Sequence, residues 1–149
     1  MKEEPDTPAE LRARALRLLA RREHSRAELG RKLAPHAETP EALDLLLTDL
    51  EKRKQLSDER YASERARSMS RKYGAARIRQ DLKAKGVDQE TVDCVSSEGD
   101  LERARAILER KYRTPAATRE DRARRMRFLQ SRGFSFEIIR SLLSSREAD

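Results

Sequence analysis

Hydrophobic residues recur at helical spacing along the chain, in short blocks separated by Gly, Pro or a capping residue. The middle block shows this pattern well: Ile78 and Leu82 lie four residues apart and therefore share one face of a helix. Gly86 suits the left-handed position after a helix, and Val87 can fold back onto Leu82, as in a Schellman motif. Asp88 can cap the next helix. This block therefore predicts a helix, its end and a new start.

The other blocks begin with comparable signals. Thr7 is followed by Pro8 and Glu10, and Ser25 is followed by Glu28, so both sites are predicted to form capping boxes. Few stretches show the alternation that a strand needs. The fold class is therefore predicted to be all-α, with helices starting after Thr7, Ser25, Thr39, Ser57, Gly74, Asp88, Asp100, Thr118 and Ser135.

The stop-and-start pattern recurs along the chain. Any two amphipathic helices align at some offset, but here the helix stops and caps align as well, which favours a true repeat. At an offset of 47 residues, Leu82, Gly86, Val87, Asp88 and Val92 fall on Leu129, Gly133, Phe134, Ser135 and Ile139. At an offset of 49, Leu29, Leu33, Thr39, Leu43 and Leu46 fall on Ile78, Leu82, Asp88, Val92 and Val95.

The first copy is atypical, because Pro35 replaces the Gly stop, as is common in terminal repeats. The pattern predicts three tandem three-helix repeats stacked into an elongated, curved molecule. The expected boundaries are a charged tail at 1–10, repeats at 11–56, 57–98 and 99–145, and a tail at 146–149.

Composition supports thin helical layers and a charged partner. Charged residues make up 41% of the 149 residues, which leaves too little apolar surface for one thick core. There are 34 basic and 27 acidic residues, giving a net charge of +7 that favours an acidic partner such as nucleic acid. A salt-bridged surface without that role is the alternative. It fits a predicted i, i+4 ladder of Arg77, Asp81 and Lys85, with Arg79 and Lys83 pointing into solvent.

Residues able to support catalysis are not arranged for it. His24 and His36 lie at predicted helix ends, where surface or capping roles are expected, and Cys94 is expected to fill a small part of the core. No phosphate loop, metal-ligand pair or nucleophile motif is found, so neither an enzyme nor a cofactor is predicted. Tyr73 and Tyr112 could stack on bases, but packing between helices is favoured. Without an apolar targeting or spanning segment, we expect a cytoplasmic protein with no membrane contact.

The basic helices around residues 60–85 and 119–132 are the candidate contact surface, because Arg and Lys supply the donors that phosphates need. No side chain is marked as a reader of base edges, so sequence-specific recognition of DNA is not indicated. The candidates are Arg65, Arg67, Arg71, Lys72, Arg77, Arg79, Lys83, Lys85, Arg119, Arg122, Arg124, Arg125, Arg127 and Arg132.

Five segments of the chain are similar to a known family. The central runs 56–62 (LSDERYA), 72–74 (KYG) and 77–87 (RIRQDLKAKGV) resemble the centre of the bacterial RecX regulatory proteins, and so do 127–135 (RFLQSRGFS) and 17–25 (RLLARREHS). The resemblance covers nearly the whole chain and keeps the order of the three repeats. One departure lies at residues 71–74 (RKYG), where many members have an extra small residue before the Tyr-Gly pair.

The resemblance implies a partner and a role. It implies three tandem three-helix units that bind the RecA recombinase polymerised on single-stranded DNA. Such proteins lie in the filament groove, limit filament extension and suppress ATP hydrolysis, strand exchange and coprotease activity, which modulates recombination, DNA repair and the SOS response. A monomer is expected. The alternative from the residues alone is a free-standing helical protein that binds nucleic acid without sequence preference.

Overall fold

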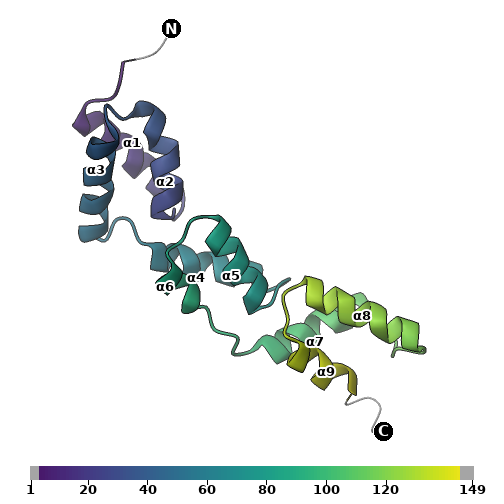
Figure 1. Cartoon of the computed structure of the whole chain (residues 1–149). Helices are drawn as coiled ribbons and strands as arrows, with labels where there is room; N and C mark the ends of the chain where they lie inside the picture. Colours follow the sequence, from purple (N-terminus) through teal and green to yellow (C-terminus); the bar gives the residue numbers. More distant parts are fainter. Residues whose placement is uncertain (1–3, 145–149) are drawn as a thin grey trace. The chain divides into compact units, whose positions relative to one another are not determined.

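A computed structural model describes residues 4–144 of the chain. Figure 1 shows that the described segments are helices joined by short loops, and no strand occurs among them. No helix of this part is long and apolar enough to cross a membrane. The elements are α1 (Pro8–Arg21), α2 (Arg26–Leu33), the 3₁₀ helix η1 (Ala34–His36), α3 (Pro40–Lys52), α4 (Asp58–Met69), α5 (Ala75–Ala84), α6 (Gln89–Asp93), α7 (Asp100–Lys111), α8 (Arg119–Ser131) and α9 (Phe136–Ser144).

The predicted helix starts are largely confirmed. Thr7 and Glu10 form a full capping box, and Thr39 and Thr118 each accept a hydrogen bond from a backbone N–H three residues on. At Ser25 only half of the predicted box forms: Ser25 Oγ accepts from the Glu28 N–H at 3.0 Å, while the Glu28 carboxylate binds an arginine instead. These caps satisfy backbone donors that the helix itself leaves unpaired.

Both predicted glycine stops are Schellman motifs. Gly86 has φ +81°, its N–H donates to Lys83, and the Val87 N–H donates to the carbonyl of Leu82 at 3.1 Å. The same bonds recur in the last repeat, where Gly133 has φ +89°. There the N–H groups of Gly133 and Phe134 donate to the carbonyls of Gln130 and Leu129. The offset of 47 therefore relates two structures that are equivalent down to their hydrogen bonds.

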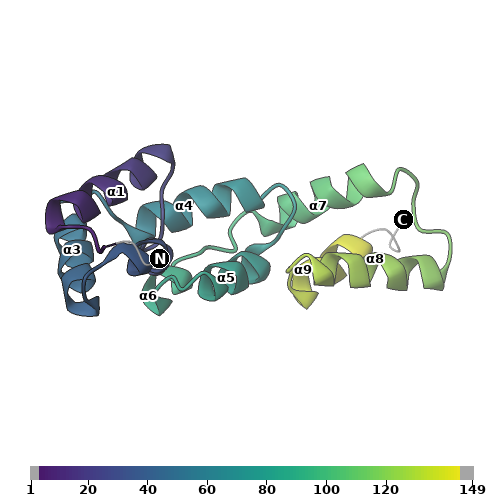
Figure 2. The same ribbon diagram turned by 90° about the horizontal axis from the view of Figure 1, so that it is seen from above.

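The described chain divides into two compact units. The first comprises residues 4–64 and 82–92, and the second comprises 65–81 and 93–144. In the first unit α1, α2 and α3 pack together around buried leucines such as Leu29 and Leu50. In the second, α7, α8 and α9 pack around Leu129. Helix α9 contacts both other helices; Figure 1 shows it beside α7, and Figure 2 shows it beside α8.

Each unit contains one joint between consecutive repeats, and the two joints are alike. In the first unit, Asp58 at the start of α4 accepts a hydrogen bond at 2.8 Å from the N–H of Arg26, the first residue of α2. In the second unit, Asp100 at the start of α7 accepts one at 3.1 Å from the N–H of Ala75, the first residue of α5. An aspartate of one repeat thus caps the second helix of the repeat before it.

The structure corrects the role predicted for Asp100. Gly99, with φ +83°, stands at the N-cap of α7, and Asp100 is its first helical residue. The Asp100 side chain is buried at 3% exposure and also pairs with Arg103. Asp100 therefore caps α5 rather than its own helix.

A second contact also recurs in both joints. In the first unit, Ser25 Oγ donates to the Lys85 carbonyl at 3.4 Å, at the end of α5. In the second, the Gly74 N–H donates to the Arg132 carbonyl at 2.7 Å, at the end of α8. The residue before the second helix of one repeat thus meets the end of the second helix of the next. The second repeat is divided between the units because it takes part in both joints.

Candidate functional site

The predicted basic residues differ widely in exposure. Most of these basic side chains face solvent, but several of the arginines are engaged within the protein. Exposed are Arg67, Arg71, Lys72, Arg77, Lys83, Lys85, Arg119, Arg124 and Arg127; half-buried are Arg65, Arg79, Arg122 and Arg132; Arg125 is buried.

Asp81 does not form the predicted ladder on α5. Its carboxylate is held by Arg65 of α4, with Nε to Oδ2 at 2.9 Å and Nη2 to Oδ1 at 3.2 Å. Such a two-point fork fixes geometry better than a single bond. Arg79 also departs from its prediction, because its guanidinium donates to the carbonyl of Val95 instead of pointing into solvent. Both arginines therefore tie elements of the second unit together.

Arg125 is enclosed by its own repeat. It is 5% exposed, donates from Nη2 to the Thr114 carbonyl at 2.8 Å, and stacks over Tyr112 at 4.4 Å from the ring centroid. Tyr112 in turn meets Phe128 edge to face at 6.0 Å. Tyr112 thus packs between helices, as favoured from the sequence.

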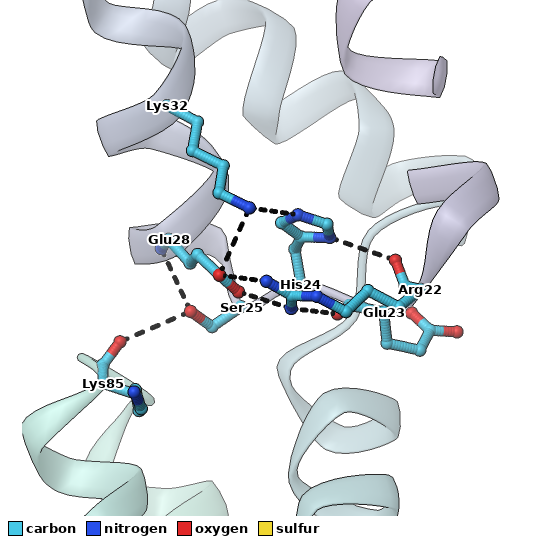
Figure 3. Close-up of polar contacts among 7 residues, drawn as sticks. All are labelled: Arg22, Glu23, His24, Ser25, Glu28, Lys32 and Lys85. Atoms are coloured by element: carbon cyan, nitrogen blue, oxygen red, sulfur yellow. Dashed lines mark hydrogen bonds and ion pairs between the residues drawn. The ribbon is translucent and has the colours of Figure 1, made fainter. Parts of the chain in front are cut away.

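Lys83 and Lys85 keep their side chains exposed at the end of α5. The first joint holds the backbone beneath them, because Ser25 Oγ donates to the Lys85 carbonyl and Gly86 ends the helix. Figure 3 shows Ser25 between α2 and this turn. The two ammonium groups are therefore presented from a fixed helix end, which suits a contact with phosphate or carboxylate groups.

His24 is the centre of the polar cluster shown in Figure 3. A surface or capping role was predicted for it, and its burial at 1% exposure excludes the surface position. Its Nδ1 lies 3.0 Å from the Arg22 carbonyl and therefore carries the proton. Its Nε2 lies 3.1 Å from Lys32 Nζ and therefore accepts. These contacts define a neutral imidazole. Burial lowers the pKa of His24, although the Arg22 carbonyl and nearby Glu28 oppose this shift.

Glu28 is the carboxylate of this cluster. Arg22 binds both of its oxygens, and Lys32 lies 3.5 Å away. The hydrogen bonds from Arg22 lower the pKa of Glu28 to about 2, against the effect of burial. The cluster thus closes the turn between α1 and α2 that carries Ser25.

At the first joint, Asp58 also accepts the Asp88 N–H at 3.2 Å. Burial raises the pKa of Asp58, while the Thr91 N–H lowers the pKa of Asp88, the cap of α6. The two carboxylates therefore occupy unequal electrostatic environments, and both bind backbone donors. Their arrangement is structural.

No arrangement in the described part of the chain favours catalysis. No group of three or more His, Cys, Asp or Glu side chains there could hold a metal ion. Cys94 is exposed, which corrects its predicted core position, because α6 ends at Asp93 and leaves Cys94 in the following loop. A pocket of about 420 Å³ lies between α1 and α3, but apolar side chains such as Leu45 and Leu46 dominate its lining.

Comparison with known proteins places the chain. Three family models match the chain in order. They are the RecX first three-helix domain at residues 12–46, the RecX second three-helix domain at 57–95 and the RecX third three-helix domain at 98–143. The chain belongs to the RecX family. This confirms the resemblance and the tandem three-helix fold, and it places the protein in a regulatory family.

Relatives in this family match along almost their whole length. The regulatory protein RecX of Leptothrix cholodnii is 46% identical over 137 residues, covering 89% of this chain and 87% of the relative. That of Herbaspirillum seropedicae is 40% identical over 148 residues, covering 97% and 96%. The crystal structure of RecX from Lactobacillus salivarius shares the fold, with a TM-score of 0.83, 19% identity, and 95% and 97% of the two chains covered.

Two basic residues of α7 make contacts that only the structure shows. Lys111 lies 4.5 Å from the ring centroid of Phe128, and Arg110 donates to the Arg71 carbonyl at 2.6 Å. Neither Lys111 nor Arg110 belongs to the contact surface predicted from the sequence. Acidic residues of the same helix, including Glu102 and Glu109, offset most of its positive charge. The adjacency of Lys111 to Tyr112 was the only local signal.

Proposed function

We propose that this protein regulates the RecA recombinase. It binds the filament that RecA forms on single-stranded DNA and inhibits filament extension, ATP hydrolysis, strand exchange and coprotease activity. It thereby modulates recombination, DNA repair and the SOS response. The observation that supports this proposal is the match of all three RecX domains, in order, within a chain that aligns with regulatory RecX proteins over most of its length.

Tandem repeats suit a polymeric partner. Each repeat adds a modest contact, and linked contacts act at a high effective concentration once the first has formed. Lys83, Lys85, Arg119 and Arg127 have exposed side chains that can meet DNA phosphates or acidic protein surface. The protein acts as a monomer in the cytoplasm under this proposal.

The second candidate is a free-standing protein that binds nucleic acid without sequence preference. The net charge of +7 favours it, since counterion release alone can drive such binding. In that case any effect on RecA would come from competition for DNA.

One titration separates the two candidates. The protein is added to preformed RecA filaments, and ATP hydrolysis is followed at several salt concentrations beside binding to the same bare DNA. Inhibition well below the concentration that coats bare DNA supports regulation of the filament. Inhibition only at DNA-coating concentrations, with the same salt dependence, would overturn it in favour of competition.

A further inference from the structure

Cations and aromatic rings alternate across one surface of the second unit. Tyr73 has the guanidinium groups of Arg77 and Arg132 each at 5.4 Å from its ring centroid. Arg132 also lies 5.0 Å from the centroid of Phe128. Lys111 Nζ follows at 4.5 Å from Phe128.

The series ends at Tyr112, 6.0 Å from Lys111 Nζ. The buried Arg125 follows, at 4.4 Å from the centroid of Tyr112. The cation–aromatic stripe is defined by Arg77, Tyr73, Arg132, Phe128, Lys111 and Tyr112.

This concentration is unusual. Strong cation–ring pairs occur about once in 70–80 residues of an ordinary protein. In the second unit, six cation–ring contacts form one connected series, whose end at Arg125 is buried. Packing alone explains an isolated pair, but it does not explain why the pairs are joined end to end. The stripe therefore suits a ligand that has both charge and flat apolar faces.

The loop that carries Tyr73 is held in place from both sides. Arg110 donates to the Arg71 carbonyl at 2.6 Å, and Arg132 Nη1 donates to the Lys72 carbonyl at 3.3 Å. The Gly74 N–H in turn donates to the backbone carbonyl of Arg132 at 2.7 Å. Side chains on such a clamped loop lose little further freedom on binding. The ring of Tyr73 is thus positioned before any ligand arrives.

The cations of the stripe retain binding capacity. A guanidinium carries five N–H donors. Arg77 donates through its Nη1 to the Ser131 carbonyl at 3.3 Å, and Arg132 donates through its Nη1 to the Lys72 carbonyl. These bonds thus engage one nitrogen of each guanidinium. Arg77 and Lys111 are exposed, while Tyr73, Phe128, Tyr112 and Arg132 are half-buried. Phosphate oxygens can therefore approach donors that lie beside partly open rings.

We propose that the cation–aromatic stripe binds single-stranded DNA, with phosphates on Arg77, Arg132 and Lys111 and bases stacked along Tyr73 and Phe128. Bases stack on aromatic rings and on guanidinium planes alike, so the alternating series offers successive platforms. A duplex hides its base faces and cannot use them. An acidic protein segment would use the cations and leave the rings idle. This inference rests on the proposed function, in which the partner filament contains single-stranded DNA, and it names the surface that touches that strand.

The test uses the full chain without RecA. Fluorescence anisotropy measures binding to a labelled oligothymidine, to an abasic strand of equal length, to a duplex and to polyglutamate. We expect the oligothymidine to bind more tightly than the other three. Tyr73→Leu should weaken oligothymidine binding by roughly 5- to 150-fold, the value of one stacked base. It should leave abasic binding unchanged. Phe136→Leu, which removes an aromatic ring that is 57% exposed outside the stripe, is the matched control.

A second variant, Lys111→Gln, tests the proposal independently in case Tyr73→Leu does not fold. Lys111→Gln removes an exposed charge and should lower the salt slope of oligothymidine binding by about 0.7, the loss of one phosphate contact. Lys52→Gln on α3 removes an exposed charge elsewhere and should leave the slope unchanged. Circular dichroism confirms the fold of each variant.

The proposal is overturned if the abasic strand, the duplex or polyglutamate binds as tightly as oligothymidine, or if Lys111→Gln and Lys52→Gln behave alike. The filament assay is run on the same proteins. Intact inhibition by a variant that no longer binds oligothymidine overturns the role of the stripe in the filament and leaves RecA regulation standing. Failure of the wild type to inhibit, with binding as expected here, rejects RecA regulation and leaves the stripe.

Discussion

Asp100 Oδ2 lies 3.1 Å from the backbone nitrogen of Ala75, so the first residue of α7 caps a helix of the preceding repeat. The carboxylate is buried and also pairs with Arg103, whose Nε is itself buried without a partner among the described residues. Asp100→Ala should therefore lower the free energy of unfolding by about 1–3 kcal/mol, since it removes a cap and leaves the half-buried guanidinium of Arg103 without its carboxylate partner. Urea titration followed by circular dichroism measures the change.

The neighbouring Glu102 provides the control. It is exposed on the same first turn, and Glu102→Gln should change the urea midpoint little. Equal stability of Asp100→Ala and Glu102→Gln would show that the cap contributes nothing to the joint.

Gly133 should tolerate no side chain. It has φ +89°, and an added Cβ would lie 2.4 Å from Arg77 Cβ and 2.5 Å from the Arg77 nitrogen. Gly133→Ala therefore forces the joint apart as well as straining the turn, and we expect a loss of about 2 kcal/mol or more in unfolding free energy. Thermal melts of the variant and wild type measure it.

Gly30 is the matched comparison, because it lies inside α2 and an added Cβ would meet only the end of the Leu47 side chain, at 3.4 Å. Gly30→Ala should leave stability unchanged or raise it by about 0.5–1 kcal/mol, since alanine favours helix. A melting temperature for Gly133→Ala at or above that of Gly30→Ala would contradict the tight approach seen at the second joint.

Stability should depend on pH through His24. The folded pKa of His24 is lowered, so the unfolded chain binds more protons and stability rises with pH. The contribution is complete above the ordinary histidine value of about 6.5 and is lost as the pH falls below it. In the His24→Gln variant, the urea midpoint should change less with pH across this range than it does in the wild type. His36→Gln should keep the slope of the wild type.

Glu28 acts in a lower window and does not confuse this measurement. Its folded pKa of about 2 lies below the unfolded value of 4.5, so its contribution is present above about pH 4.5 and is lost toward pH 2. A wild-type slope that persists in His24→Gln between pH 5 and pH 7 would assign the effect to another group.

Charge reversal at the end of α5 tests the candidate surface for RecA regulation. Lys83→Glu together with Lys85→Glu changes exposed side chains only, whereas reversing Arg77 or Arg79 would also break their bonds to backbone carbonyls. We expect roughly tenfold weaker inhibition of filament ATP hydrolysis, which corresponds to about 1.4 kcal/mol. Arg31→Glu with Lys52→Glu reverses the same charge on α2 and α3 and should inhibit normally. Equal inhibition by both double variants would remove these lysines from the contact.

Local signals predicted most of the fold. Gly86 and Gly133 end their helices as expected, because the left-handed turn and its two hydrogen bonds involve only neighbouring residues. Asp100 was misassigned because a cap across repeats has the same local sequence as an ordinary N-cap. The burial of His24 was not predicted, because it depends on how α1 meets α2. The predicted repeat boundaries at 11–56, 57–98 and 99–145 stay predictions.

The candidate surface was less accessible to sequence reasoning. Arg125 and Arg127 contribute equally to a count of charges, yet the first is buried and the second exposed. One signal could have separated them: Arg125 lies four residues before the buried Leu129 and so shares its helix face. The pairing of Arg65 with Asp81 had no such signal, since it joins two helices.

The likeness of the two joints bears on how such a chain can change length. Asp58 and Asp100 make the same bond, and Ser25 and Gly74 meet equivalent helix ends, so a middle repeat has matching connectors on its two sides. Duplicating or deleting one repeat would rejoin surfaces that already fit each other. Gene rearrangement, or a designer, could therefore alter the number of repeats without inventing a new interface.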